Sequence, residues 1–472
     1  MLLKSEVYET IQNLWKNETL IGLQDFIRLP ALSRSFDPDW ESNGILKQTL
    51  LMAMEWGKKQ LPQATFEILE SPKIPPALKI YIPAFQHHNG QPAFLYGHLD
   101  KQPEAGEWAK GLGPWQPVIK ENLLYGRGSV DDGYNFFLCL TAIKALEEHG
   151  ISHPEIFALF ETDEESGSRD LAAYVNDMAP EIGSPAFIAI ADLDALDQSR
   201  IWLTQSLRGS IALTIRVSVL NSPAHSGMAS GIVPSSFRIM RSLLDRIENA
   251  ETGELLLPEL NTDIPQNILD CIEKLALVAD VRTKFNWASE TTAVGNSSFE
   301  ALLQNTWKPS LCVTGADGLP PCNQAGNVLR TSTALKLSIR TPPTIDAQKA
   351  LAALIQVLTH DVPYNAKVEI LDSEAASGFV APLPTGWLLE SLNQSSQTHF
   401  GKEPGYLFCG ASIGTLPMFS QAFPTAPFVN TGALGPLSNA HAPNECLDLP
   451  YAIKLTCIFA DLIANIPKKC DL

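Results

Sequence analysis

Residues 93–100 read Ala-Phe-Leu-Tyr-Gly-His-Leu-Asp, an apolar run that ends in a glycine, a histidine and an acid. A short continuous apolar run of this kind is typical of a buried strand in an α/β sheet. Two further runs, at 155–160 and 186–191, also stop at acidic residues. Open α/β sheets place their sites just past the ends of such strands. The sequence therefore predicts an α/β domain whose strand ends carry the chemistry.

Helical patterns surround these runs. Residues 5–35 and 45–60 have the spacing of amphipathic helices. Residues 134–149 also have helical spacing, and the pattern stops at Gly150, a natural C-cap. Strands that alternate with helices in this way predict helices packed around the sheet.

The pattern changes after Gly209, and irregular, proline-containing sequence lies between about residues 248 and 325. Two strand–helix units predict a small α+β domain, residues 209–377, inserted into a larger domain made of residues 1–208 and 378–472. The predicted elements of the insertion are strands at 210–220, 327–340 and 366–371 and helices at 234–247 and 345–359.

Composition and charge restrict the class of protein. A chain of 472 residues is too long for one ordinary core, and 45% hydrophobic with 18% charged residues is a globular composition. The net charge of -18 argues against a nucleic-acid partner, because binding phosphates needs a positive surface. The eight cysteines contain no C-x-x-C pair, which argues against a disulfide framework and a zinc ribbon.

The sequence shows no recognisable targeting signal. Charged residues interrupt positions 1–20, so no apolar signal-peptide core is recognisable there. No segment reaches the roughly 20 apolar residues that span a bilayer, so no membrane partner is expected. The cytoplasm is the predicted location.

Five short segments carry residue types that bind metals. Each has an ordinary alternative: a lone histidine is more often a core or surface residue, the second segment reads as a turn before a helix, and the third as a solvated acidic loop. Their combination in this order is what indicates a metal site. The segments are residues 96–100, 126–133, 161–168, 191–194 and 439–445.

This order resembles the di-zinc peptidases that include cytosolic non-specific dipeptidase, carnosinases, glutamate carboxypeptidases, aminoacylase and succinyl-diaminopimelate desuccinylase. Those enzymes carry G-H-x-D-x-x-P, G-R-G-x-x-D-D, E-E-x-G-S, an acid before an inserted domain, and a late G-x-H-x-x-N-E-like segment. The matching positions here are residues 97–103, 126–132 and 164–168, Asp192, and residues 439–445. The resemblance runs from about residue 20 to the end and is strongest to the dipeptidase branch. It implies an α/β catalytic domain with a mostly parallel sheet and flanking helices, plus an inserted α+β lid and dimerisation domain.

The resemblance also implies two divalent metal ions. His98 and Asp192 would bind one ion, Glu165 and His441 the other, and Asp131 would bridge both. Two divalent cations balance three carboxylates and a bridging hydroxide, so such a site can be buried without a large cost. Histidine and carboxylate ligands without thiolate fit zinc, with manganese or cobalt as alternatives.

Further roles follow from the same resemblance. Glu164 would be the general base that takes a proton from metal-bridged water and returns it to the leaving amine. Asp100 would orient His98, and the peptide bond between Asp131 and Asp132 would be cis. Asp192 is preferred to Asp194 as a ligand, because its distance from residues 207–209 is similar to that in the dipeptidase branch.

The inserted domain supplies the expected substrate contacts. His225, in an H-S-G segment, would stabilise the oxyanion from the neighbouring subunit of a homodimer. Arg340 would hold a C-terminal carboxylate with its planar fork, and Asn327 would face the substrate. The loop at 410–414, with Gly410 and Ser412, resembles a Gly-Gly-Ser-Ile loop whose backbone contacts substrate.

Two positions depart from the dipeptidase branch. Phe408 and Cys409 replace an Arg-Glu pair before that loop, and Gly133-Tyr134 replaces the lysine that follows Asp-Asp. The expected ligands survive both changes, so substrate choice is less firmly implied than hydrolysis.

The predicted function is a metal-dependent hydrolase that cleaves dipeptides or short peptides with a free C-terminal carboxylate. The alternatives are a carboxypeptidase, or a deacylase acting on N-acyl amino acids, since those substrates also end in a carboxylate. A binding protein on a metal-free version of the same fold is disfavoured by the complete ligand set. A two-metal phosphatase or nuclease is disfavoured because no phosphate-binding glycine loop or basic patch is present.

Overall fold

The computed structural model describes residues 2–412 and 414–469, which divide into two compact units. The first unit comprises Met1–Gln205, Ala381–Leu407 and Gly414–Leu472, and the second comprises Ser206–Val380 and Phe408–Ile413. The chain breaks expected at 208/209 and 377/378 lie close to these limits. The loop 408–413, expected in the larger domain, instead groups with the second unit. It does so because the Arg208 guanidinium donates to the Gly410 carbonyl, Nε to O 3.0 Å.

A six-stranded sheet of order β1-β2-β6-β3-β7-β17 forms the centre of the first unit. The β6-β3, β3-β7 and β7-β17 pairs are parallel, whereas the hairpin β1-β2 and the β2-β6 pair are antiparallel. The three apolar runs of the sequence are β3, β6 and β7, which are buried along their whole length. The predicted parallel core is therefore confirmed. The strands are β1 Thr65–Ser71, β2 Ile74–Ile82, β3 Ala93–His98, β6 Ile156–Glu161, β7 Phe187–Ile190 and β17 Phe428–Asn430.

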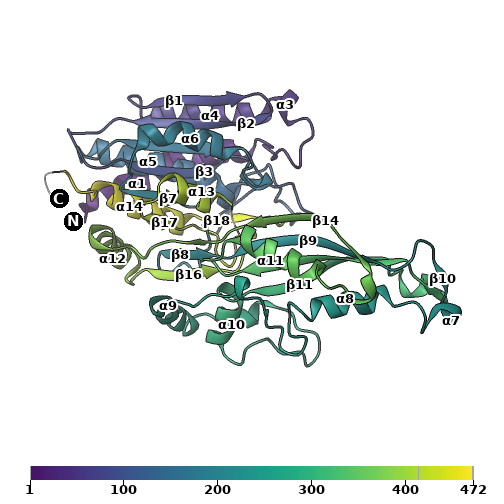
Figure 1. Ribbon diagram of the computed structural model, residues 1–472. Helices are drawn as coiled ribbons and strands as arrows, with labels where there is room; N and C mark the ends of the chain where they lie inside the picture. Colours follow the sequence, from purple (N-terminus) through teal and green to yellow (C-terminus); the bar gives the residue numbers. More distant parts are fainter. Residues whose placement is uncertain (1, 413, 470–472) are drawn as a thin grey trace. The chain divides into compact units, whose positions relative to one another are not determined.

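Helices flank this sheet (Figure 1). The helix expected at 5–35 is shorter, because α2 ends at Ile27 and Pro30 disfavours helical backbone in the residue before it. Lys101, which is fully buried, donates to the carbonyls of Phe26 and Leu29 at this end, both at 2.8 Å from Nζ. The helices are α1 Ser5–Leu14, a π-helical turn Trp15–Thr19, α2 Leu20–Ile27, α3 Trp40–Asn43, α4 Ile45–Gln60, α5 Tyr134–Glu148, α6 Leu171–Ile182, α12 Gly386–Phe400, α13 Thr415–Ala422 and α14 Leu449–Ala464.

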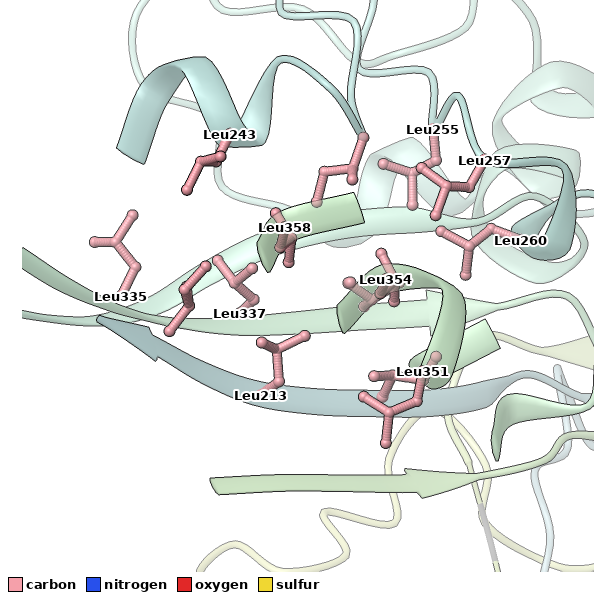
Figure 2. Packing of buried hydrophobic residues seen from close by; sticks show 14 of the residues in the cluster. Leu213, Leu243, Leu255, Leu257, Leu260, Leu335, Leu337, Leu351, Leu354 and Leu358 are labelled. Atoms are coloured by element: carbon pink, nitrogen blue, oxygen red, sulfur yellow. The ribbon is translucent and has the colours of Figure 1, made fainter. Parts of the chain in front are cut away.

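An antiparallel sheet of order β11-β13-β9-β14 forms the second unit. Buried and half-buried residues alternate strictly along β9, as expected for a sheet with one face on a core. Helices α8 and α11 cover that face, and leucines of the strands and of α11 interdigitate there (Figure 2). The elements are β9 Gly209–Ser218, β11 Ser310–Asp317, β13 Ser332–Thr341, β14 Lys367–Ala376, α8 Ser236–Leu244, α9 Gln266–Ala276, α10 Ser298–Thr306 and α11 Ala347–Thr359.

The strand predicted at 327–340 is in fact two strands, β12 (Val328–Leu329) and β13. β12 pairs with β10 (Ala224–His225), and the short helix α7 (Ser226–Ala229) follows β10. β9 and β13 pair along ten residues, from Gly209 opposite Thr341 to Ser218 opposite Ser332. Nine steps of ~3.3 Å separate these two ends by roughly 30 Å. Elements β10 and α7 lie beyond the Ser218 end (Figure 1).

Small sheets complete the fold. One has the order β18-β5-β4, with β18 Cys446–Asp448, β5 Leu123–Tyr125 and β4 Val118–Lys120, and the other has the order β15-β8-β16. The chain passes between the units within β8 (Trp202–Leu207) and β16 (Gly405–Cys409), and β15 is Phe379–Val380.

Over the described ranges, helices fall short of the length and apolarity that a membrane span requires. The seven cysteines described there are all free thiols, and Cys470 lies outside those ranges.

Candidate metal centre

His98, the last residue of β3, is the centre of the acidic cluster of the first unit. Its ring is fully buried, and Nδ1 lies 3.2 Å from the Asp100 carbonyl oxygen and 3.4 Å from the Asp100 carboxylate. On the other edge, Nε2 lies 3.1 Å from Asp131 Oδ1 and 3.5 Å from Asp192 Oδ2. The parallel strands β3 and β7 end side by side, which is why His98 and Asp192 meet. Asp100 thus faces one ring nitrogen and leaves the other toward the acids.

Asp131 lies between two imidazoles. Its Oδ1 faces His98, and its Oδ2 lies 2.9 Å from Nε2 of His441, a residue of the distant C-terminal segment. Although burial opposes ionisation, these two histidines hold the pKa of Asp131 below its usual range. The Asp131–Asp132 peptide bond is cis, as the family resemblance implied. A carboxylate with one oxygen toward each histidine has the arrangement that a ligand shared by two cations requires.

The adjacent glutamates Glu164 and Glu165 have different surroundings. The Glu165 carboxylate lies 3.1 Å from Nε2 of His441 and accepts a 2.7 Å hydrogen bond from Nε2 of Gln102. The Glu164 carboxylate, which is half-buried, has no hydrogen-bond partner among the described residues. The backbone amides of both glutamates instead donate to the Asp100 carboxylate, at 3.3 and 3.1 Å. One glutamate is therefore held in place by its side chain, and the other keeps a free carboxylate.

Two overlapping groups of side chains have donor atoms close enough to hold cations. One joins His98, Asp132 and Asp192, and the other joins His98, Asp131 and Glu165; within each group these atoms lie within 4.8 Å of one another. Sequence reasoning gave Asp132 no role. Its Oδ2 accepts from the His98 backbone amide at 3.2 Å, and its buried Oδ1 has no partner among the described residues.

The charge of the cluster supports a cation site. Burial, reinforced by neighbouring acids, raises the pKa of Glu165 to about 7 and that of Asp192 to about 6. Burial also raises the pKa values of Asp132 and Glu164 well above their ordinary values. Acids this crowded cannot all ionise without positive charge, and divalent cations would supply it. The donor set, which is histidine and carboxylate without thiolate, fits such ions.

A buried ion pair that the sequence did not predict connects the loops of the cluster. Arg127 Nη1 lies 2.7 Å from Glu445 Oε2, and both side chains are almost fully buried. Glu445 Oε1 accepts from the backbone amides of Val130 and Asp131, at 3.1 and 3.3 Å, and Arg127 Nη2 donates to the Ala442 carbonyl at 3.2 Å. The pair thus joins the turn that carries Asp131 to the segment that carries His441. The only sequence signal was that both residues fall within the matched motifs.

In the second unit, His225 and Asn327 lie at one end of the sheet. The antiparallel pair β10-β12 puts His225 opposite Val328, and the Ser226 amide donates to the Asn327 carbonyl at 2.9 Å. His225 is exposed, and its Nδ1 accepts from the Gly227 amide at 3.1 Å. His225 comes after Ser218, the last residue of β9, and Asn327 precedes Ser332, the first residue of β13 and the partner of Ser218.

Arg340 and the loop at 408–413 lie at the opposite end of the same sheet. Arg340 pairs with Ser210 in the β9-β13 register, and its Nη1 donates to Ser412 Oγ at 2.9 Å. Ser412 Oγ in turn donates to the Arg208 carbonyl at 2.6 Å, and the Arg208 side chain contacts Gly410. Residue 413 of the loop motif lies outside the described residues. The structure therefore joins Arg340, Ser412 and Gly410 but separates them from His225 and Asn327.

The sequence matches a known protein family, and the fold is similar to that of solved structures. The sequence model of peptidase family M20/M25/M40 matches residues 94–465. The cysteinylglycine-S-conjugate dipeptidase of Corynebacterium striatum is 22% identical over 413 residues, 84% of this chain and 86% of that protein. The Cys-Gly metallodipeptidase dug1 of Schizosaccharomyces pombe is 24% identical over 390 residues, 79% of this chain and 80% of that protein. The M20 family metallo-carboxypeptidase Sso-CP2 from Sulfolobus solfataricus has a similar fold, with a TM-score of 0.76 at 19% identity over 95% of this chain and 99% of that one.

Proposed function

Since the chain belongs to peptidase family M20/M25/M40 and is a metallopeptidase, we propose that it hydrolyses dipeptides or short peptides that have a free C-terminal carboxylate. The observation that carries this proposal is Asp131, whose two carboxylate oxygens face the imidazoles of His98 and His441, while the Glu164 carboxylate has no hydrogen-bond partner among the described residues. The names of similar proteins, Cys-Gly and cysteinylglycine-S-conjugate dipeptidases, support dipeptides as the substrate class.

Two divalent ions are proposed to bind the cluster, with Asp131 shared. His98 and Asp192 would hold one ion, and Glu165 and His441 the other. Zinc suits the donor set best, and manganese and cobalt remain to be compared. When bound, the ions would polarise the scissile carbonyl and make water acidic enough to lose a proton near neutral pH.

The residues of the chain would perform the proton transfers. Glu164 would accept a proton from the attacking water at its carboxylate and deliver it to the leaving nitrogen, so that water and amide become acid and amine. Its lack of a side-chain partner supports this role, because Glu165 is engaged by His441 and Gln102. Asp100 would fix the tautomer of His98 through Nδ1.

A homodimer is also proposed, and the geometry of one unit supports it. His225 would donate to the oxygen that becomes negative, and Arg340 would hold the terminal carboxylate. Arg340 lies near one end of the ten-residue β9–β13 pair and His225 lies beyond the other end, and the two ends are roughly 30 Å apart. A dipeptide is far shorter, so one chain cannot apply both residues to one substrate. A partner chain would supply the second. Asn327 would act beside His225, since the two lie together.

The experiment is a substrate panel measured with zinc, manganese and cobalt added separately. It compares dipeptides, longer peptides, C-terminally amidated peptides and N-acyl amino acids. We expect dipeptides with a free carboxylate to be cleaved fastest and amidated ones poorly. Faster release of acyl groups from N-acyl amino acids would replace the dipeptidase by the deacylase alternative. A preference for long peptides would favour a carboxypeptidase. The cytoplasmic location is tested separately by fractionation.

A further inference from the structure

A pocket of about 250 Å³ lies within the second unit, away from β10 and α7. One wall is apolar and partly exposed: Phe285 is 59% exposed, Trp287 41% and Val294 67%. The rings of Phe285 and Trp287 meet edge to face, with centroids 5.8 Å apart. Exposed aromatic side chains that line a concave surface are typical of a binding pocket for a small apolar group.

Arg208 forms the polar part of the same pocket. It is only 6% exposed, yet all of its side-chain acceptors among the described residues are neutral. Nε donates to the Gly410 carbonyl, and Nη1 lies 3.4, 3.3 and 3.2 Å from the Gln304 carbonyl, the Lys308 carbonyl and Ser310 Oγ. No carboxylate within the described ranges pairs with this guanidinium. Buried charges are normally paired, because removing a charge from water without a partner is costly.

The neighbouring cations make an anion in this pocket more favourable. Burial, followed by repulsion from Arg340, lowers the pKa of Arg208 to about 10. Ser412 connects the two arginines, since it accepts from Arg340 and donates to the Arg208 carbonyl. The other cation of the pocket wall, Arg282, is neutralised by Asp280 through two contacts of 2.9 and 2.8 Å. The unbalanced positive charge is therefore that of Arg208, with Arg340 close by, in a chain of net charge -18.

We propose that this pocket binds a carboxylate that has an apolar or aromatic body of amino-acid size. The carboxylate would lie at Arg208, and the apolar body would lie against Phe285 and Trp287. The proposed binding requires only the contacts with Arg208, Phe285 and Trp287. Two sources of this chemistry are possible. One is the C-terminal residue of a dipeptide, which rests on the proposed function and whose carboxylate Arg208 would share with Arg340; the other is a separate carboxylate ligand. The Arg208 Nη2 group, which has no acceptor among the described residues, would donate to the carboxylate in a charge-assisted hydrogen bond.

The test uses isothermal titration of the full, metal-loaded protein with 3-phenylpropionate, a probe without an amide bond. Propionate lacks the ring, and 3-phenylpropan-1-ol lacks the charge. We expect both controls to bind at least about tenfold more weakly, because each loses one half of the contacts. Equal binding of the alcohol, or absence of 3-phenylpropionate binding at millimolar concentration, would overturn the proposal.

Two matched substitutions locate the binding. Val294→Asp adds a negative charge at the pocket rim, whereas Val278→Asp adds the same charge at a residue that is 59% exposed and outside the pocket. We expect Val294→Asp to weaken 3-phenylpropionate binding several-fold and Val278→Asp to leave it unchanged. Equal effects of the two variants would place the probe elsewhere. Trp287→Ala, which removes a partly exposed ring, should weaken binding by about tenfold.

Kinetics separate the two sources. If the pocket takes the C-terminal residue, 3-phenylpropionate inhibits competitively, and Trp287→Ala raises KM for dipeptides ending in Phe more than for those ending in Gly. If the ligand is separate, the probe binds with the same affinity in the presence of saturating dipeptide. Either result supports the pocket. The protein could cleave no peptide but still bind 3-phenylpropionate in a way that Val294→Asp weakens. That result would refute the proposed function and leave this inference standing.

Discussion

The acidic cluster of the first unit and the His225 end of the second differ in how completely one chain forms them. In the cluster, side chains of the chain satisfy one another: Asp131 reaches both the buried His98 and the exposed His441, and Asp100 holds the amides of Glu164 and Glu165. At the other region, His225 is exposed, and among the described residues its ring bonds only to the Gly227 backbone amide, two residues away. Reciprocal contacts between side chains mark a site that one chain can form by itself. An exposed histidine remote from Arg340 marks a site that would need a second molecule.

Replacing Asp131 is expected to have the largest effect. Asp131→Ala removes the carboxylate that faces both histidines, so both ions should be lost and peptide hydrolysis should fall to background. Metal content by elemental analysis and activity are measured on the same sample. Asp177→Ala, an exposed acid of α6, is the control and should keep both. Retention of two ions by Asp131→Ala would show that the cluster does not share this ligand.

Glu164→Ala separates chemistry from metal binding within the cluster. Because the Glu164 carboxylate has no side-chain partner among the described residues, its loss should leave two ions bound. Turnover should nevertheless fall by about 10²–10⁴-fold, the usual contribution of a general base. Elemental analysis and kcat provide the two readings. A metal-free Glu164→Ala protein would mean that Glu164 and Glu165 exchange roles.

The incompleteness of the His225 region is tested by complementation. His225→Ala alone should lose ~3–4 kcal/mol of transition-state stabilisation. When His225→Ala and Glu164→Ala chains are co-expressed, a mixed dimer has one site with Glu164 and the His225 of the other chain. Partial activity should then return. A mixture that stays inactive, or a strictly monomeric protein at assay concentration, would show that the region does not act across subunits.

The Arg127–Glu445 pair provides a stability test of the first unit. Glu445→Gln leaves a buried guanidinium without its counter-charge, which should cost about 3 kcal/mol in the free energy of unfolding. The measurement is urea-induced unfolding with added metal. Glu55→Gln, at an exposed position of α4, should change the unfolding midpoint little. Equal stability of the two variants would mean that the pair does not hold the loops together.

The comparison also explains what sequence could predict. His98 and Asp192 end neighbouring parallel strands, so strand-end patterning placed both at the edge of the sheet, and the family resemblance paired them. Asp131 and His441 meet although they are far apart in the chain, and only the family resemblance joined them. Asp132 and Arg208 were missed because their environment comes from long-range contacts that no local pattern encodes.

Some local structure was missed although the sequence carried a signal. Helix α9 buries Ile268, Ile272 and Leu275, which have helical spacing, but the prolines around it made the region read as irregular. The end of α2 was predicted too late because Lys101, distant in sequence, caps its carbonyls. Short elements of this kind depend on contacts with the rest of the fold as much as on their own pattern.

Arg340→Lys has the smallest expected effect. It tests the end of the second unit's sheet that lies opposite His225. Lysine keeps the positive charge but loses the planar fork, so kcat/KM for dipeptides with a free carboxylate should fall by an amount equivalent to roughly 1–3 kcal/mol. Amidated dipeptides, which are expected to be poor substrates already, should change little, because the lost contact is to the carboxylate. Arg216→Lys, also half-buried and on the neighbouring strand β9, is the matched control and should behave like the unmodified protein. If free and amidated peptides were hydrolysed equally by the unmodified protein, or lost equal activity in Arg340→Lys, Arg340 would not be the carboxylate clamp. The whole second unit would then contribute to catalysis through its His225 end alone.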